Sequence, residues 1–284
     1  MIDRAGLAGF LRQRRESLQP EDVGLPRGQR RRTRGLRREE IATLCHMSSD
    51  YYSRLEQERG PQPSEQMAAS IAQGLHLSLD ERDHLFRLAG LSPPVRAPGG
   101  DHIAPGLLRI FDRLGDTPAE IVTELGETLR QTPLGVALTG DTMRFAGPAR
   151  SRVYRWFTDP GCRRLYPPEE HAYHSRVLVS GLRQVSSVRG PGSRAAALAD
   201  LLLAESAEFR TLWEQHEIGL SFDEVKNYVH PEVGPLRLNC QRLLDPSQSH
   251  LMLVFTAEPG TEDAERLRLL SALGTHRFHD APTA

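Results

Sequence analysis

The sequence predicts two domains, an all-α domain followed by a mixed α+β domain, and three observations lead to this fold class. Apolar side chains in residues 5–89 recur at helical spacing, whereas residues after 105 mix helical and strand-like patterns. Residues 92–105 contain four prolines and two glycines, a composition typical of a linker. The net charge also changes sign, from +3 over residues 1–96 to −4 over residues 97–284.

The chain of 284 residues is long enough for two modest domains. Composition and periodicity together predict how it divides. The expected parts are a helical domain at 1–91, a linker at 92–105, an α+β domain at 106–275 and a tail at 276–284.

The overall net charge of −1 hides a basic end of the chain, because residues 1–38 carry 11 arginines and only four acidic residues. Such asymmetry is typical of proteins that face nucleic acid. The chain has no apolar run long enough to span a membrane and no signal-peptide pattern at its start. Its three cysteines, Cys45, Cys162 and Cys240, lie far apart, which favours reduced thiols over disulfides. We therefore expect a cytoplasmic protein without membrane contact.

The first domain is expected to contain five helices, separated early on by a long basic loop at residues 20–36. Serine precedes two of the helices in the N-cap position, where its hydroxyl can accept a hydrogen bond from the first turn. The expected helices are 5–18, 37–45, 49–59 after Ser48, one that starts after Ser64, and 80–89.

The second and third of these helices have the spacing of a helix-turn-helix, because only His46 and Met47 separate the first from its Ser48-capped partner. The major groove of B-DNA admits one helix, whose first residues reach the base edges. Arg54 can pair bidentately with guanine, and Asp50 can accept a hydrogen bond from cytosine. The expected DNA contacts are Arg31, Arg32, Arg34, Arg37, Arg38, Ser48, Ser49, Asp50, Ser53 and Arg54. A helical bundle with a solvated arginine face would show the same periodicity.

The second domain is expected to be α+β, with a hairpin followed by helices and then a group of strands. The expected helices are 133–138, 170–188, 194–205, 207–216 and one that starts at Thr261. The expected strands are the hairpin within 120–130, then 226–230, 236–244 and 251–256.

Candidate catalytic and metal-binding groups are few. Glu170, His171 and His174, next to Glu169, could share a helix face as metal ligands do, but acidic residues also suit a helix N-terminus after two prolines. His230 before Pro231 fits a strand-end hydrogen bond better than acid–base catalysis. Cys162 lies beside Arg163 and Arg164, which could lower the pKa of its thiol. The chain lacks a nucleophile elbow, a P-loop and a dinucleotide fingerprint, so we expect no enzyme, no metal and no cofactor.

Particular segments resemble a known family of regulators. LRREEIATLCHMSSDYYSRLEQERGPQPS resembles the XRE-type, lambda-repressor-like helix-turn-helix. The basic loop PEDVGLPRGQRRRTRGL is similar to that of the MmyB-like transcriptional regulators of actinobacteria. The second domain resembles the ligand-binding domain of the same regulators in VYRWFTDPGCRRLYPPEEH, FRTLWEQHE, HPEVGPLRLNCQ and FTAEPGTEDAERLRLL.

This resemblance implies a PAS-like second domain that binds a small apolar molecule such as a fatty acid, in a protein that acts as a dimer. Clustered aromatic side chains would then form the wall of the ligand pocket, although they would serve equally well as plain core. The expected ligand contacts are Tyr154, Phe157, Phe209, Trp213 and Phe255.

Two positions depart from the pattern of the family, since His46 and Glu58 stand where its members usually carry glycine. His46 is expected to adopt a left-handed backbone, and Gly60 is expected to cap the third helix.

Together these features predict a sequence-specific transcription regulator. Its partners would be double-stranded operator DNA, a small hydrophobic ligand that modulates operator binding, and a second copy of the chain. The alternatives are a metal- or His/Glu-dependent enzyme in the second domain, or a protein-interaction module.

Overall fold

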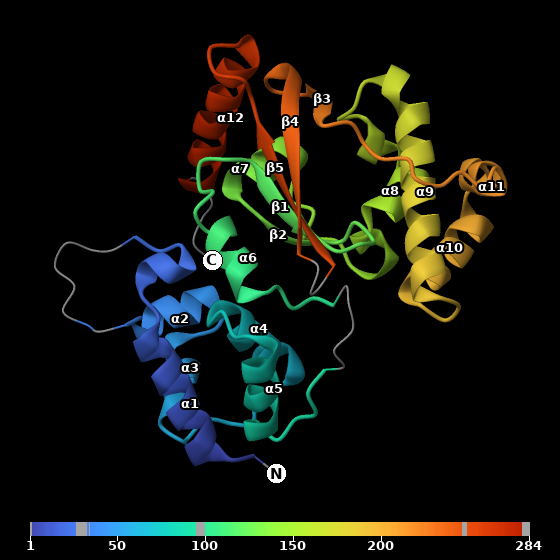
Figure 1. The fold of residues 1–284 in the computed structure, drawn as a ribbon. Helices are drawn as coiled ribbons and strands as arrows, with labels where there is room; N and C mark the ends of the chain where they lie inside the picture. The colour runs from blue at the N-terminus through green and yellow to red at the C-terminus, as the bar shows by residue number, and fades with distance from the viewer. Residues whose placement is uncertain (1, 27–32, 34, 95–99, 246–248, 280–284) are drawn as a thin grey trace. The chain divides into compact units, whose positions relative to one another are not determined.

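The computed structural model describes residues 2–26, 33, 35–94, 100–245 and 249–279. The chain forms two compact units, Met1–Arg113 and Leu114–Ala284, here called the first unit and the second unit. The first unit is all-helical, and the second combines helices with one antiparallel sheet (Figure 1). The predicted order of an all-α domain followed by an α+β domain is therefore confirmed.

The first unit surrounds one apolar core. Its elements are α1 (Arg4–Ser17), η1 (Pro20–Val23), α2 (Arg38–Leu44), α3 (Ser49–Glu56), α4 (Glu65–Gly74), α5 (Leu79–Leu88) and α6 (Pro105–Phe111). The side chains that the helical spacing places on one face, among them Leu11, Ile41, Tyr52 and Ile71, are fully buried. Burial of this stripe is what holds such short helices in place, because isolated helices of this length are unstable in water.

The turn between α2 and α3 has the expected left-handed residue, because His46 has a φ of 51°. The expected C-cap is wrong. Glu58, with a φ of 64°, is the left-handed residue after α3, and the amides of Arg59 and Gly60 both donate to the Arg54 carbonyl. The helix ends at Glu56 and not at residue 59. Gly60 instead permits a close approach, because a Cβ there would lie 2.6 Å from the Leu55 side chain.

The short helix α6 and the residues before it pack within the first unit. The buried His102 ring lies between two groups, with Nε2 2.8 Å from the Leu77 carbonyl and Nδ1 3.1 Å from the Gln73 amide nitrogen. The His76 ring lies 3.3 Å from the Asp112 carboxylate. The boundary between the two compact units therefore lies after Arg113. The proline and glycine content predicts a linker earlier in the chain, at 92–105.

The second unit contains a five-stranded sheet in the order β2-β1-β5-β4-β3, in which every neighbouring pair is antiparallel. Val122 pairs with Leu251 and Tyr228 with Leu236, so the apolar side chains of neighbouring strands share one face. The strands are β1 (Ala119–Val122), β2 (Thr128–Gln131), β3 (Val225–His230), β4 (Gly234–Asp245) and β5 (His250–Thr256).

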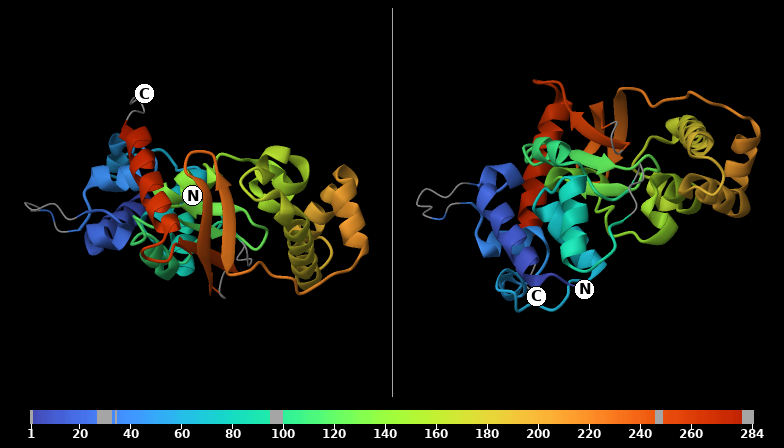
Figure 2. Two further views of the ribbon diagram at one scale, coloured as in Figure 1. Left: turned by 90° about the horizontal axis from the view of Figure 1, so that it is seen from above. Right: turned by 60° about the horizontal axis from the view of Figure 1, so that its bottom comes forward.

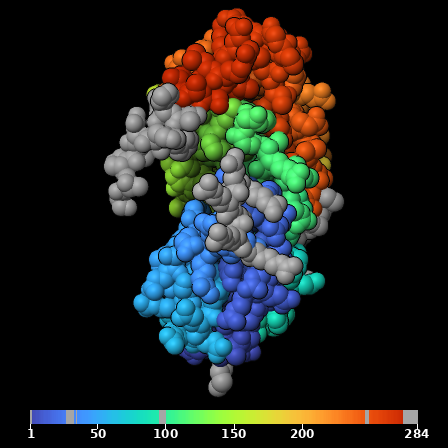
Figure 3. Space-filling model, turned by 90° about the vertical axis from the view of Figure 1, so that its left-hand side faces the viewer, coloured from blue at the N-terminus to red at the C-terminus, as the bar shows by residue number. Residues whose placement is uncertain are grey.

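The helices of the second unit form two groups. Helices α9, α10 and α11 pack on one another, with α8 against α9 and α10, whereas α12 packs on α7 and β4 (Figure 1, Figure 2). Helix α12 forms an outer surface of this unit (Figure 3). The helices are α7 (Pro133–Thr139), α8 (Arg152–Thr158), α9 (His171–Arg189), α10 (Arg194–Glu205), α11 (Ala207–Glu214) and α12 (Glu262–His279). Within the described residues, no helix has both the length and the apolar character needed to cross a membrane.

Candidate DNA interface and ligand cavities

Helix α3 presents a short polar edge to solvent. The Ser48 hydroxyl caps the helix by accepting from the Tyr51 amide at 3.1 Å, as its position predicts. Ser49, Asp50 and Arg54 are exposed, and Ser53 is half-buried. The Arg54 guanidinium lies 2.7 Å from the Asp50 carboxylate, one turn away on the same face. The two side chains expected to read bases are therefore neighbours that restrain each other.

The arginines expected to contact the DNA backbone differ in their surroundings. Arg37 is exposed, and its amide donates to the Glu40 carboxylate at the start of α2. Arg38 is half-buried, because its Nε donates to the Glu56 carboxylate at 2.8 Å. Arg31, Arg32 and Arg34 lie outside the described residues.

Glu56 is a buried charge whose burial the helical pattern of the sequence does not reveal. Its carboxylate is fully buried and accepts from Arg15 at 2.6 Å as well as from Arg38, so it links α1, α2 and α3. Burial raises the pKa of Glu56, but the hydrogen bonds from Arg15 and Arg38 outweigh burial and hold that pKa below its ordinary value. A glutamate in an amphipathic helix looks like a surface residue, and its burial depends on partners far away in the sequence.

The second unit contains a cavity of about 460 Å³ between the sheet and helices α8 and α9, here called the apolar cavity. Its wall is mostly aliphatic and aromatic. The apolar residues that line it are Val122, Val153, Trp156, Val177, Leu178, Leu182, Val185, Leu220, Phe222, Leu244, Leu251, Leu253 and Phe255.

Two cations that are buried or half-buried, Lys226 and Arg152, lie in the wall of the apolar cavity, and a third lining cation, Arg242, is exposed. The Lys226 ammonium lies 3.4 Å from the centre of the Phe222 ring, and the Arg152 guanidinium lies 5.2 Å from it. Burial, together with the charge of Arg152, lowers the pKa of Lys226 to about 7. Among the described residues, no carboxylate lies within ion-pair distance of either cation, and Asp223 and Glu120 act only from farther away.

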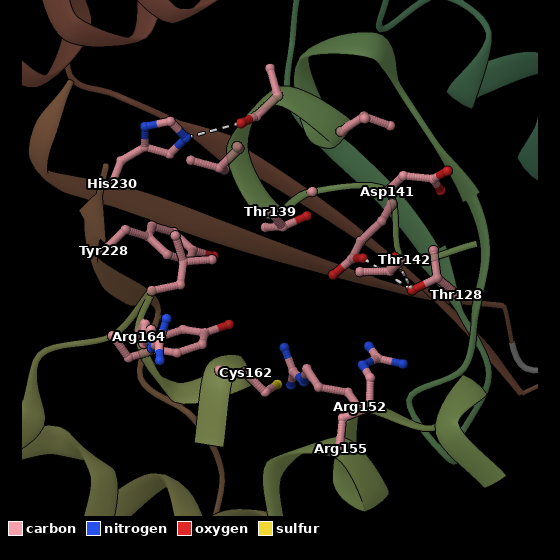
Figure 4. Close-up of a pocket in the computed structure, with 18 of the residues that line it drawn as sticks. Thr128, Thr139, Asp141, Thr142, Arg152, Arg155, Cys162, Arg164, Tyr228 and His230 are labelled. Atoms are coloured by element: carbon pink, nitrogen blue, oxygen red, sulfur yellow. Dashed lines mark hydrogen bonds between the residues drawn. The ribbon is translucent and has the colours of Figure 1, made fainter. Parts of the chain in front are cut away.

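A second cavity of about 790 Å³ shares residues with the first. It is here called the polar cavity, because arginines, carboxylates and threonines interrupt its largely apolar wall (Figure 4). Arg152, Arg155, Arg164 and Cys162 lie on one side of the view, whereas His230, Thr139, Asp141 and Thr142 lie on the opposite side. The two cavities share part of their walls. The shared residues are Val122, Gly126, Arg152, Tyr166, Tyr228 and Leu253.

The predicted aromatic contacts divide between cavity and core. Phe255 lines the apolar cavity, but Tyr154, Phe157, Phe209 and Trp213 line neither cavity and belong to the core of the helical layer. The rings of Phe157 and Phe209 meet edge to face at 5.2 Å, and Trp213 stacks on Phe209 at 5.3 Å. Four of the five expected contacts therefore line neither cavity. Phe209 is buried among the helices from α8 to α11, and Tyr154, Phe157 and Trp213 are partly buried against the same cluster.

Among the described residues, the Glu/His cluster included, no three His, Cys, Asp or Glu side chains are grouped so that they could hold a metal ion. The His171 ring contacts the backbone carbonyls of Arg163 and Tyr166. Burial among aromatic rings lowers the pKa of His174 to about 4, with Lys226 and Arg152 adding to the effect.

The remaining candidate residues have structural surroundings. His230 contacts the Ala137 carbonyl and accepts from the Glu232 amide, as expected of a strand-end histidine. The expectation for Cys162 is wrong, because burial raises its pKa although Arg155 and Arg152 oppose the shift.

These units define a class of protein, a DNA-binding transcription regulator with a separate ligand-binding domain. Residues 7–85 match the family model of a helix-turn-helix domain, and residues 103–270 match that of the MmyB-like transcription regulator ligand binding domain. The second match covers more than half of the chain, which therefore belongs to the MmyB-like transcription regulators. The description of the second model is that of a transcription regulator and not of an enzyme. A comparison with curated proteins found no significant match.

Proposed function

We propose that the second unit senses a molecule with a fatty-acid-like chain, and that its binding changes the affinity of the helix-turn-helix for operator DNA. The regulator would act as a homodimer, because two copies of α3 on one side of the duplex would read two half-sites. Operator DNA is the expected partner, so the cytoplasm stays the expected location.

The observation that carries this proposal is the combination of an apolar cavity with unpaired cations in its wall. Ligand pockets are typically apolar with a few polar anchors, and about 460 Å³ lies within their usual size range. A buried cation without a carboxylate partner is costly, and a bound anion relieves that cost. An acyl chain against the aliphatic wall, with its carboxylate at Arg152 and Lys226, satisfies both features.

For the DNA contacts we propose that α3 lies in the major groove. Ser48, Ser49, Asp50, Ser53 and Arg54 would face base edges or the adjacent phosphates. Arg37 and Arg38 would approach the backbone beside the groove. Arg31, Arg32 and Arg34 would add phosphate or minor-groove contacts from the basic loop.

The ligand can change operator affinity only if it binds one arrangement of the dimer better than the other. Footprinting of the full-length protein on its operator across concentrations of dodecanoate, paired with calorimetric titration, tests this. We expect saturable dodecanoate binding and a shift in operator occupancy over the same concentrations. Unchanged occupancy at saturating ligand would overturn the switching proposal.

The position of the site can be tested at Gly181 on α9. This residue lines the apolar cavity, and a Cβ added there meets no atom within 4 Å. A side chain can therefore begin at this position without strain, and Gly181→Phe should occupy part of the cavity and strongly weaken dodecanoate binding. Val188→Phe, at an exposed position of the same helix, is the matched control and should bind as the wild type does. Undiminished binding by Gly181→Phe would place the ligand elsewhere.

A further inference from the structure

We propose that the ligand carries a hydroxylated phosphate headgroup on its acyl chain, and that the polar cavity holds this headgroup. The inference rests on the proposed function, since the chain of the same molecule would occupy the apolar cavity. The chemical class is a single-chain acyl amphiphile of the acylglycerol phosphate type.

The first step is the contact between the two cavities. Arg152, Tyr166 and Tyr228 line both of them, so a group that reaches Arg152 from the apolar side already borders the polar cavity. The carboxylate of a free fatty acid would end at that point, whereas an acylglycerol phosphate has an ester in its place and would bring its phosphate to Arg152 as the compensating anion. The polar cavity of about 790 Å³ lies beyond it and is larger than the cavity proposed for the chain. A free fatty acid would leave this larger space without ligand atoms.

The second step is the cationic wall of the polar cavity (Figure 4). Arg155 is buried, and its guanidinium is oriented by the Ala149 and Arg150 carbonyls at 2.5 and 2.8 Å and by the Phe145 ring at 4.4 Å. Two exposed arginines, Arg144 and Arg164, also line the cavity. Guanidinium groups suit phosphate because several N–H donors can face its oxygens at once.

The third step is the set of carboxylates and hydroxyls that lie within the otherwise largely apolar remainder of the wall. Thr139, Asp141 and Thr142 lie opposite the arginines, and the Thr142 hydroxyl donates to Thr128 at 2.9 Å (Figure 4). Carboxylates line the cavity as well. They are Glu120, Asp141, Asp159 and Glu232. Glu120 acts on Arg152 and Arg155, and Asp159 acts on Cys162, so these two carboxylates lie nearer the arginines, whereas Asp141 lies opposite them. A bare anion would be repelled by Asp141, whereas a headgroup with hydroxyl donors can add hydrogen bonds to carboxylate and threonine oxygens while its phosphate faces the arginines.

The test is a calorimetric titration of the full-length protein with three amphiphiles of equal chain length. They are an acylglycerol 3-phosphate, the corresponding monoacylglycerol and the free fatty acid, each below its micelle concentration. We expect the phosphate compound to bind at least about tenfold more tightly than either of the others. Equal affinities of the phosphate compound and the free acid would overturn the inference and leave the proposed function intact. Failure of all three to bind would overturn both.

Variants of Arg144 and Arg164, the two exposed arginines of the polar cavity, test where the headgroup binds. The double variant Arg144→Gln/Arg164→Gln should remove most of the tenfold advantage and leave the affinity for the free acid unchanged. Arg210→Gln, which replaces an exposed arginine of α11 that lines neither cavity, is the matched control and should keep the advantage. An advantage that survives the double variant contradicts the placement. Glycerol 3-phosphate that binds as tightly as its acyl form would show that the chain contributes nothing, and would overturn the inference.

Discussion

At the scale of single residues, buried charged side chains occur in two kinds of surroundings. Glu56 is fully buried, but Arg15 and Arg38 compensate its charge, so the carboxylate can stabilise the first unit. Lys226 is buried in a cavity wall, and among the described residues no carboxylate forms an ion pair with it, although ionised groups away from water are costly. Compensated charges therefore belong to the fold, and uncompensated ones indicate where a ligand of opposite charge would bind.

Replacement of Glu56 by glutamine should destabilise the first unit by about 3–5 kcal/mol, because the buried Arg15 loses its counter-charge. Chemical denaturation at neutral pH measures this, with Glu39→Gln at an exposed site of α2 as the control, expected within about 0.5 kcal/mol. The pKa of Glu56 is lowered in the fold, so its contribution is present above the ordinary value of 4.5 and is lost as the pH falls toward the lowered value. A wild type and variant of equal stability at pH 7 would contradict the assigned role.

Lys226→Met should stabilise the second unit most at pH 7 and below. The folded-state pKa of Lys226 is lowered from 10.5 to about 7, so the unfolded chain holds more protons between these values. The stability of the wild type therefore rises with pH over that window, by at most about 1.4 kcal/mol per unit, and the variant lacks this rise. Denaturation of both proteins measures their free energies of unfolding, and the advantage of the variant should be smaller at pH 9 than at pH 7. The same advantage at both pH values would contradict the lowered pKa of Lys226.

At the scale of elements, two short helices matter most. Helix α3 owes its position to Tyr52, Leu55 and Glu56, which face inward, and this leaves Asp50 and Arg54 on the opposite edge. Helix α6 is held within the first unit by the chain before it, through the buried His102. The family match begins at residue 103, so the sequence family of the ligand-binding domain includes α6 although it packs in the first unit.

Arg54→Ala should weaken operator binding by about 1–3 kcal/mol and relax selectivity at one base pair. The loss should be smaller on an operator that already carries a mismatch at that position. Electrophoretic shifts on a panel of operator variants measure both effects, with Arg87→Ala on α5 as a control outside the proposed interface. Selectivity that is untouched by Arg54→Ala would show that the recognition edge is misplaced.

His102→Ala should destabilise the first unit by about 1–3 kcal/mol, because the Leu77 carbonyl loses a buried donor. Amide hydrogen exchange in α4 and α5 of the full-length protein reports the loss locally. Arg109→Ala, at an exposed position of α6, should leave exchange in these helices unchanged. Equal exchange in His102→Ala and wild type would mean that the segment does not support the first unit.

At the scale of the whole molecule, function depends on a free energy that couples two sites. If the ligand changes operator affinity by some factor, operator DNA must change ligand affinity by the same factor. Titration of dodecanoate into the free protein and into its operator complex should therefore give affinities whose ratio equals the ratio from footprinting. Equal dodecanoate affinities of the free protein and the operator complex, together with a shift in footprinting, would contradict this linkage. The shift would then not arise from the dodecanoate site that calorimetry measures.

The distribution of charge between the two matched regions is also a property of the whole molecule. All the arginines of residues 1–38 except Arg4 lie within the helix-turn-helix match, and the acidic excess after residue 96 lies mostly in the ligand-binding domain match. A net charge of +3 over residues 1–96 is small for a DNA-binding region, so operator affinity should depend on local arginine placement and on pairing of two chains.

Much of the fold could be predicted because the signals are local. Ser48 and Ser64 cap their helices as serine before an apolar stripe predicts, and the apolar runs at 236–244 and 251–256 form paired strands. Helix α8 was not predicted, because seven residues are too few to establish a period. Helix α6 was missed for the same reason, beside prolines that indicate a linker.

The sequence by itself determined the order of the domains, the helix-turn-helix and the family, because periodicity, caps and motifs depend on neighbours along the chain. Only the tertiary structure decided which aromatic side chains line a cavity, since Phe209 and Phe255 are both buried in apolar clusters but Phe255 also borders the apolar cavity. It also decided that Glu56 is paired whereas Lys226 has no carboxylate partner among the described residues. Burial and pairing depend on distant segments that the fold brings together, and no local pattern contains that information.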